Sequence, residues 1–401
     1  MQYASANLRH LDEYAARWPD DEGELVRKQD KLVLETVLLL LVADRVGARQ
    51  NERSWAELVE YCTRWCRAQR VRYVMARHPQ TVTSLGAGHL HLSALGYPDA
   101  GMDRLVANAV RTGEVGAHGC SPFRRMEQQW IFRQLASGPL GEIFSGLITP
   151  WDLDTPFISS DMVGIYSNRD DCYALTHALM YVTDFGQDEI PGITPEDLRS
   201  SIGSAACLAL AISDFDILGE LQLADAVVPG TASGAVQCGW ALRTHVLHKQ
   251  GFLPGPTFRD EDYERQPAAG RDAYRFLHQY HVAYVDALLC ATVLARNEEW
   301  LSPGENATPA VPSPDALRIV DIAWPSPPHR TPPAVANLLE LPIAPAVLLE
   351  ALTEAATIAI VRRYDLTALT RMVVASKDSR AGDSKGIQVA AQFLSNQASL
   401  I

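Results

Sequence analysis

Helical periodicity runs through almost the whole chain and constrains the fold more than any other feature. Successive segments of about 12 to 20 residues carry apolar side chains at i, i+3, i+4 and i+7, and loops containing Gly or Pro separate them. A strand with one buried face would show alternation of period two instead, and no segment does so convincingly. The sequence therefore predicts an all-α protein.

Several segments look buried on both faces, which narrows the architecture. The run LVLETVLLLLVA (Leu32 to Ala43) is one example. Both faces are buried in a double layer, where inner helices turn one face to a cavity and the other to an outer ring of helices. We therefore expect an α/α toroid-like helical barrel. An open helical-repeat solenoid is the alternative, although no fixed-period repeat is visible.

Proline content sets the expected domain boundaries. Residues 301–333 contain so much proline that an extended linker is predicted there. Residues 1–300 are then the main helical domain, and residues 334–401 are C-terminal helices packed on it. Within the main domain, residues 186–227 read as a proline-initiated connection followed by one long helix.

The stretch from Asp161 to Gly186 contains a helix with an unusual polar face. At about 100° per residue, Tyr173, His177, Tyr181 and Asp184 fall within an arc of roughly 80°. An ordinary surface helix carries solvated Lys, Arg or Glu on its polar side. Residues of this kind favour the wall of a pocket, while the alternative is a buried helix whose polar groups satisfy one another.

Two other helical segments carry comparable groups. Tyr274, His278 and His281 fall within about 60° of one another in the segment that follows Arg271. Asp216 and Glu220 are like charges at i and i+4, which either water screens or a cation, an arginine or a substrate offsets.

We therefore hypothesise that these faces converge on one cavity, where histidine shuttles protons near neutral pH. The expected catalytic residues are His177, Asp184, Tyr181, His278 and His281. The expected substrate-binding residues are Tyr173, Asp216, Glu220, Asp161 and Tyr274.

Composition and charge limit the partners. The 401 residues carry a formal net charge of −13, which disfavours nucleic acid because phosphate binding needs a clustered basic surface. The N-terminus lacks a signal peptide, no apolar run is long enough to span a membrane, and the seven cysteines read as reduced core residues. We expect a cytoplasmic protein with a small-molecule substrate and, as a partner, a second copy in a homodimer.

Metal and cofactor motifs are missing from the sequence. No P-loop, GxGxxG, HExxH, CxxC or GxSxG is present. His118, Cys120 and Cys238 lie next to glycines but lack the spacing of a zinc site. No metal and no cofactor are therefore predicted.

One segment supports a family resemblance. The string YALTHALMYVTDFG (173–186) resembles a family of helical actinobacterial proteins that is sometimes associated with specialised metabolism. The resemblance covers the middle of the chain and implies no established activity. Asp214-Phe215-Asp216 is similar to part of the acidic motif of class II terpene cyclases, but Ile217 stands where that motif has a further aspartate.

Two classes of function follow. The favoured one is an enzyme of specialised metabolism that uses His, Asp and Tyr for acid–base chemistry in a helical-barrel cavity, as a lyase, cyclase or hydrolase. The alternative is a non-catalytic helical scaffold that binds a peptide or protein. A terpene-cyclase-like toroid enzyme is a second alternative.

Overall fold

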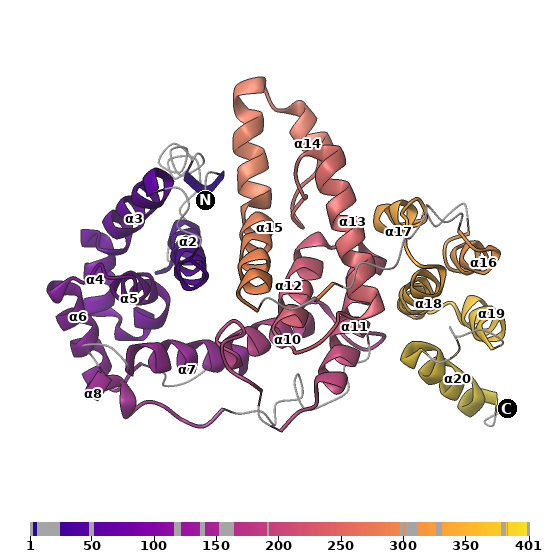
Figure 1. Ribbon diagram of the computed structural model, residues 1–401, viewed down its shortest axis with the longest axis horizontal. Helices are drawn as coiled ribbons and strands as arrows, with labels where there is room; N and C mark the ends of the chain where they lie inside the picture. Colours follow the sequence, from indigo (N-terminus) through magenta and orange to yellow (C-terminus); the bar gives the residue numbers. More distant parts are fainter. Residues whose placement is uncertain are drawn as a thin grey trace. The chain divides into compact units, whose positions relative to one another are not determined.

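The computed structural model of the chain is helical throughout the part that it describes (Figure 1). The described residues are 3–5, 25–47, 52–115, 122–136, 141–151, 164–190, 192–296, 300–301, 312–325, 331–377, 382 and 384–398. No strand occurs within these ranges, so the all-α prediction is confirmed for them. The choice between a toroid and a solenoid stays a prediction.

Two compact units divide the chain. Unit 1 comprises residues 1–153, 180–189 and 257–296, and unit 2 comprises residues 154–179, 190–256 and 297–401. Each unit combines segments that are far apart in the sequence. For this reason the expected boundaries at residues 300 and 333 do not coincide with the division.

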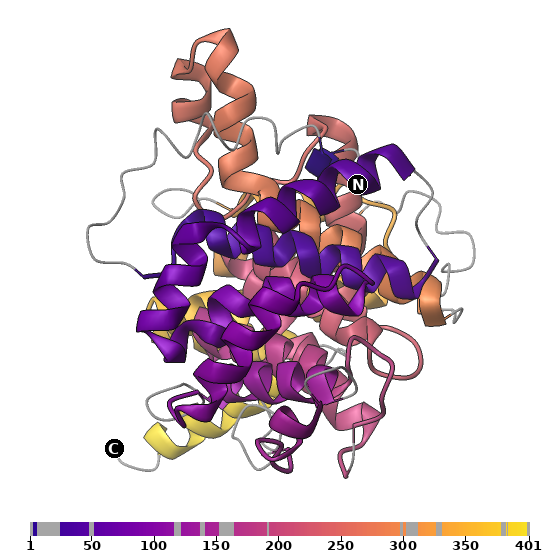
Figure 2. The ribbon, with the colours of Figure 1, turned by 90° about the vertical axis from the view of Figure 1, so that its left-hand side faces the viewer.

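Unit 1 is built around α2 (Lys28–Arg45), the helix that contains the apolar run noted above. This helix contacts α3 (Glu52–Cys66), α5 (Ala87–Ala94) and α15 (Ala268–Arg296). Leu32 on α2 is fully buried, and burial of such a side chain contributes about 1.5–3 kcal/mol. Figure 2 shows the N-terminal helices of this unit in indigo to purple.

The other described helices of unit 1 are all shorter than α2. They are α4 (Gln69–Arg77), η1 (Pro79–Thr81), the π-helical turn η2 (Val82–Gly86), α6 (Ala100–Arg111), α7 (Pro122–Ala136), α8 (Gly141–Ser145) and α14 (Asp260–Arg265). Both ribbon views show α14 beside α15 (Figures 1 and 2).

Unit 2 is organised around α12 and α18. Helix α18 contacts α11, α13, α16, α19 and α20, and α12 contacts α11 and α13 (Figure 1). The C-terminal helices therefore pack on helices that precede residue 300. The described helices of this unit are α10 (Arg169–Val182, of which residues 180–182 belong to unit 1), α11 (Pro195–Ile212), α12 (Phe215–Ala226), α13 (Gly234–Gln250), α16 (Pro314–Ala323), α17 (Pro333–Leu338), α18 (Pro345–Arg362), α19 (Leu366–Ser376) and α20 (Lys385–Ala398).

The prediction of a single long helix within residues 186–227 is wrong, because the helix ends at Ser213 and a second one begins at Phe215. Ser213 has a φ of 55°, the left-handed conformation that ends many helices. Asp214 then caps α12, since its Oδ1 accepts hydrogen bonds from the N–H groups of Asp216 and Ile217, each at 3.1 Å. The Ser-Asp pair thus separates two helices despite the continuous apolar pattern.

The linker expected at residues 301–333 also needs correction, because it contains α16. Ser313 caps this helix by accepting a hydrogen bond from the N–H of Ala316 (3.1 Å), and Pro314 occupies its first turn, where proline is tolerated. The following residues of the helix contain no proline, and their apolar side chains apart from Leu317, Ile319 among them, are buried where α16 packs on α18. High proline content around a segment therefore does not prevent a capped amphipathic helix within it.

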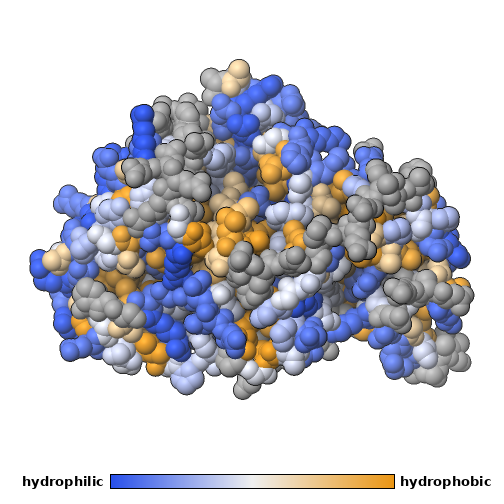
Figure 3. Space-filling model, viewed as in Figure 1, coloured by the Kyte–Doolittle hydropathy of each residue, from blue (hydrophilic) through white to orange (hydrophobic). Residues whose placement is uncertain are grey.

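No helix in the described part of the chain has the length and apolar character needed to cross a membrane. On the face shown in Figure 3, hydrophilic and hydrophobic residues are interspersed.

Candidate functional site

The N-terminal end of α10 is capped by Asn168. Asn168 Oδ1 accepts hydrogen bonds from the backbone N–H groups of Asp170 (2.7 Å) and Asp171 (3.2 Å). The Asp171 carboxylate in turn accepts one from the N–H of Asn168 (2.8 Å). This reciprocal capping satisfies donors that a helix start leaves unpaired, and it sets the register of α10.

Planar side chains are stacked along one side of α10. The Arg169 guanidinium lies over the ring of Tyr173, at 4.9 Å from its centroid. The Tyr173 and His177 rings are nearly parallel, with an interplanar angle of 21° and centroids 5.8 Å apart. The three residues are spaced at i, i+4 and i+8, so helical geometry alone brings them into line.

Helix α12 is buried over its whole length, so each polar side chain on it needs a partner. Asp216 and Glu220 are 3% and 1% exposed. Gln222 and Asp225 are fully buried. Each of these four side chains accepts a hydrogen bond from another part of the chain, which offsets the cost of burying its polar atoms.

Asp216 joins α12 to the planar groups of α10. The Tyr173 hydroxyl donates a short hydrogen bond to Asp216 Oδ2, and Arg169 Nη2 lies 3.3 Å from the same oxygen. Arg169 Nε also donates to Asp214 Oδ2 at 2.7 Å. The guanidinium therefore bridges both aspartates of the Asp214-Phe215-Asp216 sequence.

Glu220 lies next to the accessible histidine of α10. Thr176 Oγ1 donates to Glu220 Oε2 at 2.7 Å, and His177 Nε2 lies 3.7 Å from the same oxygen. The Glu220 side chain is 1% exposed, whereas 27% of the His177 side chain is exposed. A buried carboxylate thus lies beside an imidazole that is partly exposed to solvent. We call Arg169, Tyr173, His177, Asp216 and Glu220 the α10–α12 site.

Electrostatics keep the Tyr173 phenol neutral. Burial, followed by the negative charges of Asp216 and Glu220, raises the pKa of Tyr173 far above its usual value. For Arg169, burial lowers the pKa, but the hydrogen bond to Asp214 and the carboxylate charges outweigh it and raise the pKa. At neutral pH the site therefore contains a neutral phenol, whose O–H is donated to Asp216, and a permanent guanidinium cation.

Asp184 does not share the α10 face, contrary to the sequence pattern, because the helix ends at Val182. Asp184 and Phe185 have φ values of 46° and 55°, so helical periodicity no longer applies. Asp184 Oδ1 accepts hydrogen bonds from Arg45 Nη1 (2.8 Å) and from the Trp130 indole (2.6 Å) in unit 1.

Tyr181, on the last turn of α10, also belongs to unit 1. Its hydroxyl donates to Glu127 Oε1 at 3.3 Å, and its ring packs 5.4 Å from that of Trp130. Tyr181 is 9% exposed and lies at the margin of the core.

The predicted residues of α15 do not form one group: Tyr274 and His278 contact each other, whereas His281 lies beside a residue of α2. His278 Nδ1 is 2.8 Å from Thr257 Oγ1, and its ring packs 4.2 Å from that of Tyr274. The Tyr274 hydroxyl accepts a hydrogen bond from the N–H of Arg259 (3.1 Å). His281 Nδ1 instead lies 3.2 Å from Glu35 Oε2 on α2.

The structure therefore brings four of the predicted residues together. Tyr173, His177, Asp216 and Glu220 meet in unit 2, whereas Tyr181, Asp184, Tyr274, His278 and His281 belong to unit 1. Asp161 lies outside the described residues. Convergence of the His177 and His278 faces stays a prediction.

The sequence interpretation missed Arg169, which is a member of the site, and it missed Thr176 and Asp214, which form hydrogen bonds with the members Glu220 and Arg169. Arg169 had a usable signal, because it precedes Tyr173 by four residues and extends the stripe by one turn. Thr176 had none, since it lies among apolar positions and only the approach of α12 gives it a partner.

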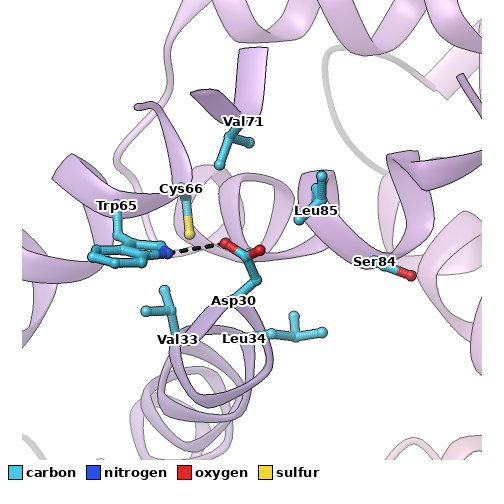
Figure 4. Close-up of a pocket in the computed structure, with 9 residues that line it drawn as sticks. Asp30, Val33, Leu34, Trp65, Cys66, Val71, Ser84 and Leu85 are labelled. Carbon is cyan, nitrogen blue, oxygen red and sulfur yellow. Dashed lines mark hydrogen bonds between the residues drawn. The ribbon is translucent and has the colours of Figure 1, made fainter. Parts of the chain in front are cut away.

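A pocket in unit 1 has a different character (Figure 4). It lies beside Asp30 and Cys66 and has room for about one water molecule. The Asp30 carboxylate accepts hydrogen bonds from the Trp65 indole (3.0 Å) and from Arg70. Burial, followed by the charge of Asp30, raises the pKa of Cys66 to about 12, so the thiol stays protonated. We interpret this pocket as structural.

The described residues do not contain the ligand arrangement of a metal centre. In those ranges no group of three or more His, Cys, Asp or Glu side chains is arranged to hold a metal ion. Burial raises the pKa of Cys238 to about 12, which disfavours the thiolate that zinc requires. His118 and Cys120 lie outside the described residues.

Asp225 is a buried carboxyl group whose pKa differs clearly from its usual value. Its Oδ2 accepts a hydrogen bond from the Trp300 indole (2.8 Å), and its Oδ1 is 4.0 Å from Arg199 Nε. Burial raises the pKa of Asp225 to about 6, although Trp300 and Arg199 lower it in part. An unfolded aspartate has a pKa of about 3.9.

This difference predicts a pH-dependent stability. Between about pH 4 and pH 6 the folded protein binds more protons at Asp225 than the unfolded chain does, so this contribution is full below about pH 4 and is lost as pH rises through 6. From pH 4 to pH 7, the free energy of unfolding of the wild type should fall by about 2–3 kcal/mol relative to Asp225→Asn. Urea unfolding at both pH values measures it, and a constant difference between the proteins would contradict it.

Comparisons with known proteins give one match. A family model described as a domain of unknown function (DUF6895) matches residues 1–291. No similar protein was found among the curated proteins or among the solved structures. The matched range includes every residue of the α10–α12 site.

Proposed function

The chain belongs to the DUF6895 family, a domain of unknown function, and from the α10–α12 site we propose that it is an acid–base enzyme acting on a small molecule. One observation carries the proposal: His177 is partly exposed, and its Nε2 lies 3.7 Å from the buried carboxylate of Glu220. A carboxylate next to one ring nitrogen orients an imidazole and favours its protonated form during proton transfer.

Each residue has a role in this proposal. His177 takes a proton from the substrate or gives one to it, and Glu220 orients the ring and stabilises the imidazolium ion. Tyr173 stays neutral, and because its only O–H proton is donated to Asp216, its oxygen can accept a hydrogen bond from the substrate. Arg169 donates a hydrogen bond to the same carboxylate. Proton transfer of this kind serves a lyase, a cyclase or a hydrolase.

The finer expectations from the sequence belong to the same proposal. They are a toroid-like cavity, a role in specialised metabolism, a cytoplasmic location and a homodimer. The terpene-cyclase-like alternative receives less support, because Arg169 pairs with both Asp214 and Asp216. An aspartate that protonates an alkene must first carry a proton, and an adjacent guanidinium favours the ionised form.

The scaffold alternative has one observation in its favour. Leu317 on α16, Leu366 and Val374 on α19 and Phe393 on α20 are between 42% and 57% exposed, and α19 contacts both of the other helices. Exposed apolar side chains on contacting helices are compatible with binding a peptide or protein.

A metabolite screen separates the two functions. The wild type and Glu220→Gln should be incubated with the same mixture of small metabolites, and the mixture followed by mass spectrometry. We expect at least one compound to be consumed by the wild type and consumed much more slowly by the variant, because a neutral amide at this position cannot stabilise an imidazolium ion. Equal consumption by both proteins contradicts the proposed role of Glu220, and consumption by neither protein favours the scaffold.

A further inference from the structure

The segment from Arg64 to Arg111 in unit 1 differs in charge from the rest of the chain. It contains seven arginines, two aspartates and no lysine or glutamate, so its formal charge is +5. Since the whole chain carries −13, the residues outside this segment carry −18. A concentration of positive charge within an acidic chain indicates a surface that attracts negative charge.

The two aspartates of this segment already have partners within it. Asp99 Oδ2 lies 3.3 Å from Arg72 Nη2, and Asp103 Oδ1 lies 2.9 Å from Nε2 of His89, which is fully buried. Within the described ranges, no acidic side chain forms an ion pair with the exposed arginines of α4 and α6, which are Arg77, Arg104 and Arg111. Their charge is therefore available to a partner.

These exposed arginines lie on two helices that pack side by side (Figure 1). Arg72, in the middle of α4, approaches the first turn of α6, where a Cβ atom at Gly101 would be 3.1 Å from its Nη1. Further along both helices, Met75 and Val106 approach Gly86, at which a Cβ atom would lie 3.2 Å from Met75 Cε and 3.6 Å from Val106 Cγ2. The two helices thus run in the same direction, and the end of α4 lies beside the second half of α6.

Periodicity arranges the exposed side chains of both helices in stripes. On α4, Tyr73 and Arg77 are four residues apart, and the Arg77 guanidinium lies 5.9 Å from the centroid of the Tyr73 ring. Tyr73 is 62% exposed. On α6, Arg104, Asn108 and Arg111 are spaced at i, i+4 and i+7 and are exposed. We call these five residues the α4–α6 surface.

The chemistry of this surface specifies its partner. Tyrosine and arginine are the side chains that most often dominate the binding energy of protein interfaces. We propose that the α4–α6 surface docks an acidic segment of another protein. Carboxylates of that segment pair with Arg77, Arg104 and Arg111, and an apolar side chain packs on the exposed ring of Tyr73.

The charge of the rest of the chain favours a short acidic segment over an extended polyanion. Nucleic acid or an anionic membrane would also approach the residues that carry −18 and would be repelled by them. A short segment contacts the α4–α6 surface alone, because charges more than about 10 Å away are largely screened at ordinary ionic strength. This inference goes beyond the proposed acid–base function and does not depend on the α10–α12 site.

A labelled peptide tests the proposal with the full chain. The probe is a synthetic peptide of glutamates on both sides of one phenylalanine, and the control peptide has glutamines in their place. Fluorescence anisotropy should show binding of the glutamate peptide only. Its affinity should fall by about tenfold as the ionic strength rises from ~0.01 M to ~0.15 M, since the Debye length shortens from about 30 Å to about 8 Å. Absence of binding at low salt overturns the proposal.

Single charge reversals locate the binding surface. Arg77→Glu and Arg104→Glu should each weaken binding of the glutamate peptide by at least about tenfold, because attraction becomes repulsion. Both side chains are exposed, so the variants should fold, and the two reversals are independent of each other. Arg371→Glu makes the same change in net charge at an exposed position of α19 and should leave the affinity unchanged. Equal weakening by Arg371→Glu would show that net charge, and not this surface, determines binding.

Tyr73→Ala tests the apolar contact. It should weaken binding of the glutamate peptide by about fivefold at low and high salt alike, since the loss is not electrostatic. With a peptide that has glycine in place of phenylalanine, the same variant should bind as the wild type does. A variant that binds both peptides as tightly as the wild type overturns the role of Tyr73.

Other occupants of the surface give different results. Tighter binding of single-stranded oligothymidylate, or of vesicles containing phosphatidylserine, that is lost in Arg77→Glu would overturn the proposal in favour of that polyanion. A dimer in sedimentation velocity that Arg77→Glu dissociates would assign the surface to a second copy instead. None of these experiments measures turnover, so their failure leaves the proposed acid–base function in place, and a negative metabolite screen leaves the α4–α6 surface in place.

Discussion

Replacing His177 with asparagine should lower turnover of the substrate by about 10²- to 10⁴-fold, the usual contribution of a positioned general acid or base. The fold should survive the change. The His177 side chain is 27% exposed, and its ring stacks on Tyr173 at the surface of α10. Activity and melting temperature of the same preparation are the two measurements, and they are informative only together.

A matched control distinguishes chemistry from general damage. His248→Asn changes an exposed histidine near the end of α13 in the same unit, and we expect neither its activity nor its melting temperature to change. If His177→Asn lost activity only in proportion to a lower melting temperature, His177 would be a packing residue. If it kept full activity, the proton transfer would lie elsewhere in the chain.

The composition of the site follows from the sequence only in part. Periodicity places Tyr173 and His177 on one face of α10, and Asp216 and Glu220 one turn apart on α12, because the members of each pair lie within one helix. Both assignments depend on local geometry, which the spacing of residues determines. The pairing of Glu220 with Thr176 and His177 does not, since it depends on how α12 packs beside α10.

The errors arose where local backbone conformation overrode the pattern. Apolar periodicity continues through Ser213, yet a left-handed residue and an aspartate cap divide the segment into α11 and α12. The polar stripe of α10 likewise continues in the sequence to Asp184, although the helix has already ended.

Removing the carboxylate of Asp184 should destabilise the fold strongly. In Asp184→Ala, the buried indole of Trp130 loses its acceptor and Arg45 loses the partner that lies at 2.8 Å. Alanine must also adopt a φ near 46°, which costs about 1 kcal/mol or more outside glycine, asparagine and aspartate. Together these losses should lower the free energy of unfolding by about 3–4 kcal/mol. Asp188→Ala, an exposed neighbour, should change it by less than about 0.5 kcal/mol.

Asp184→Asn separates the charge from the conformation. Asparagine tolerates the left-handed region and keeps an oxygen that can accept from Trp130, so only the ion pair with Arg45 is lost. We expect a loss of about 1–2 kcal/mol, measured by denaturant unfolding. Because Arg45 and Trp130 already engage this carboxylate, turnover per folded molecule should change little at a temperature well below melting. A large loss of turnover with normal stability would instead restore Asp184 to the catalytic role that its place in the sequence pattern suggested.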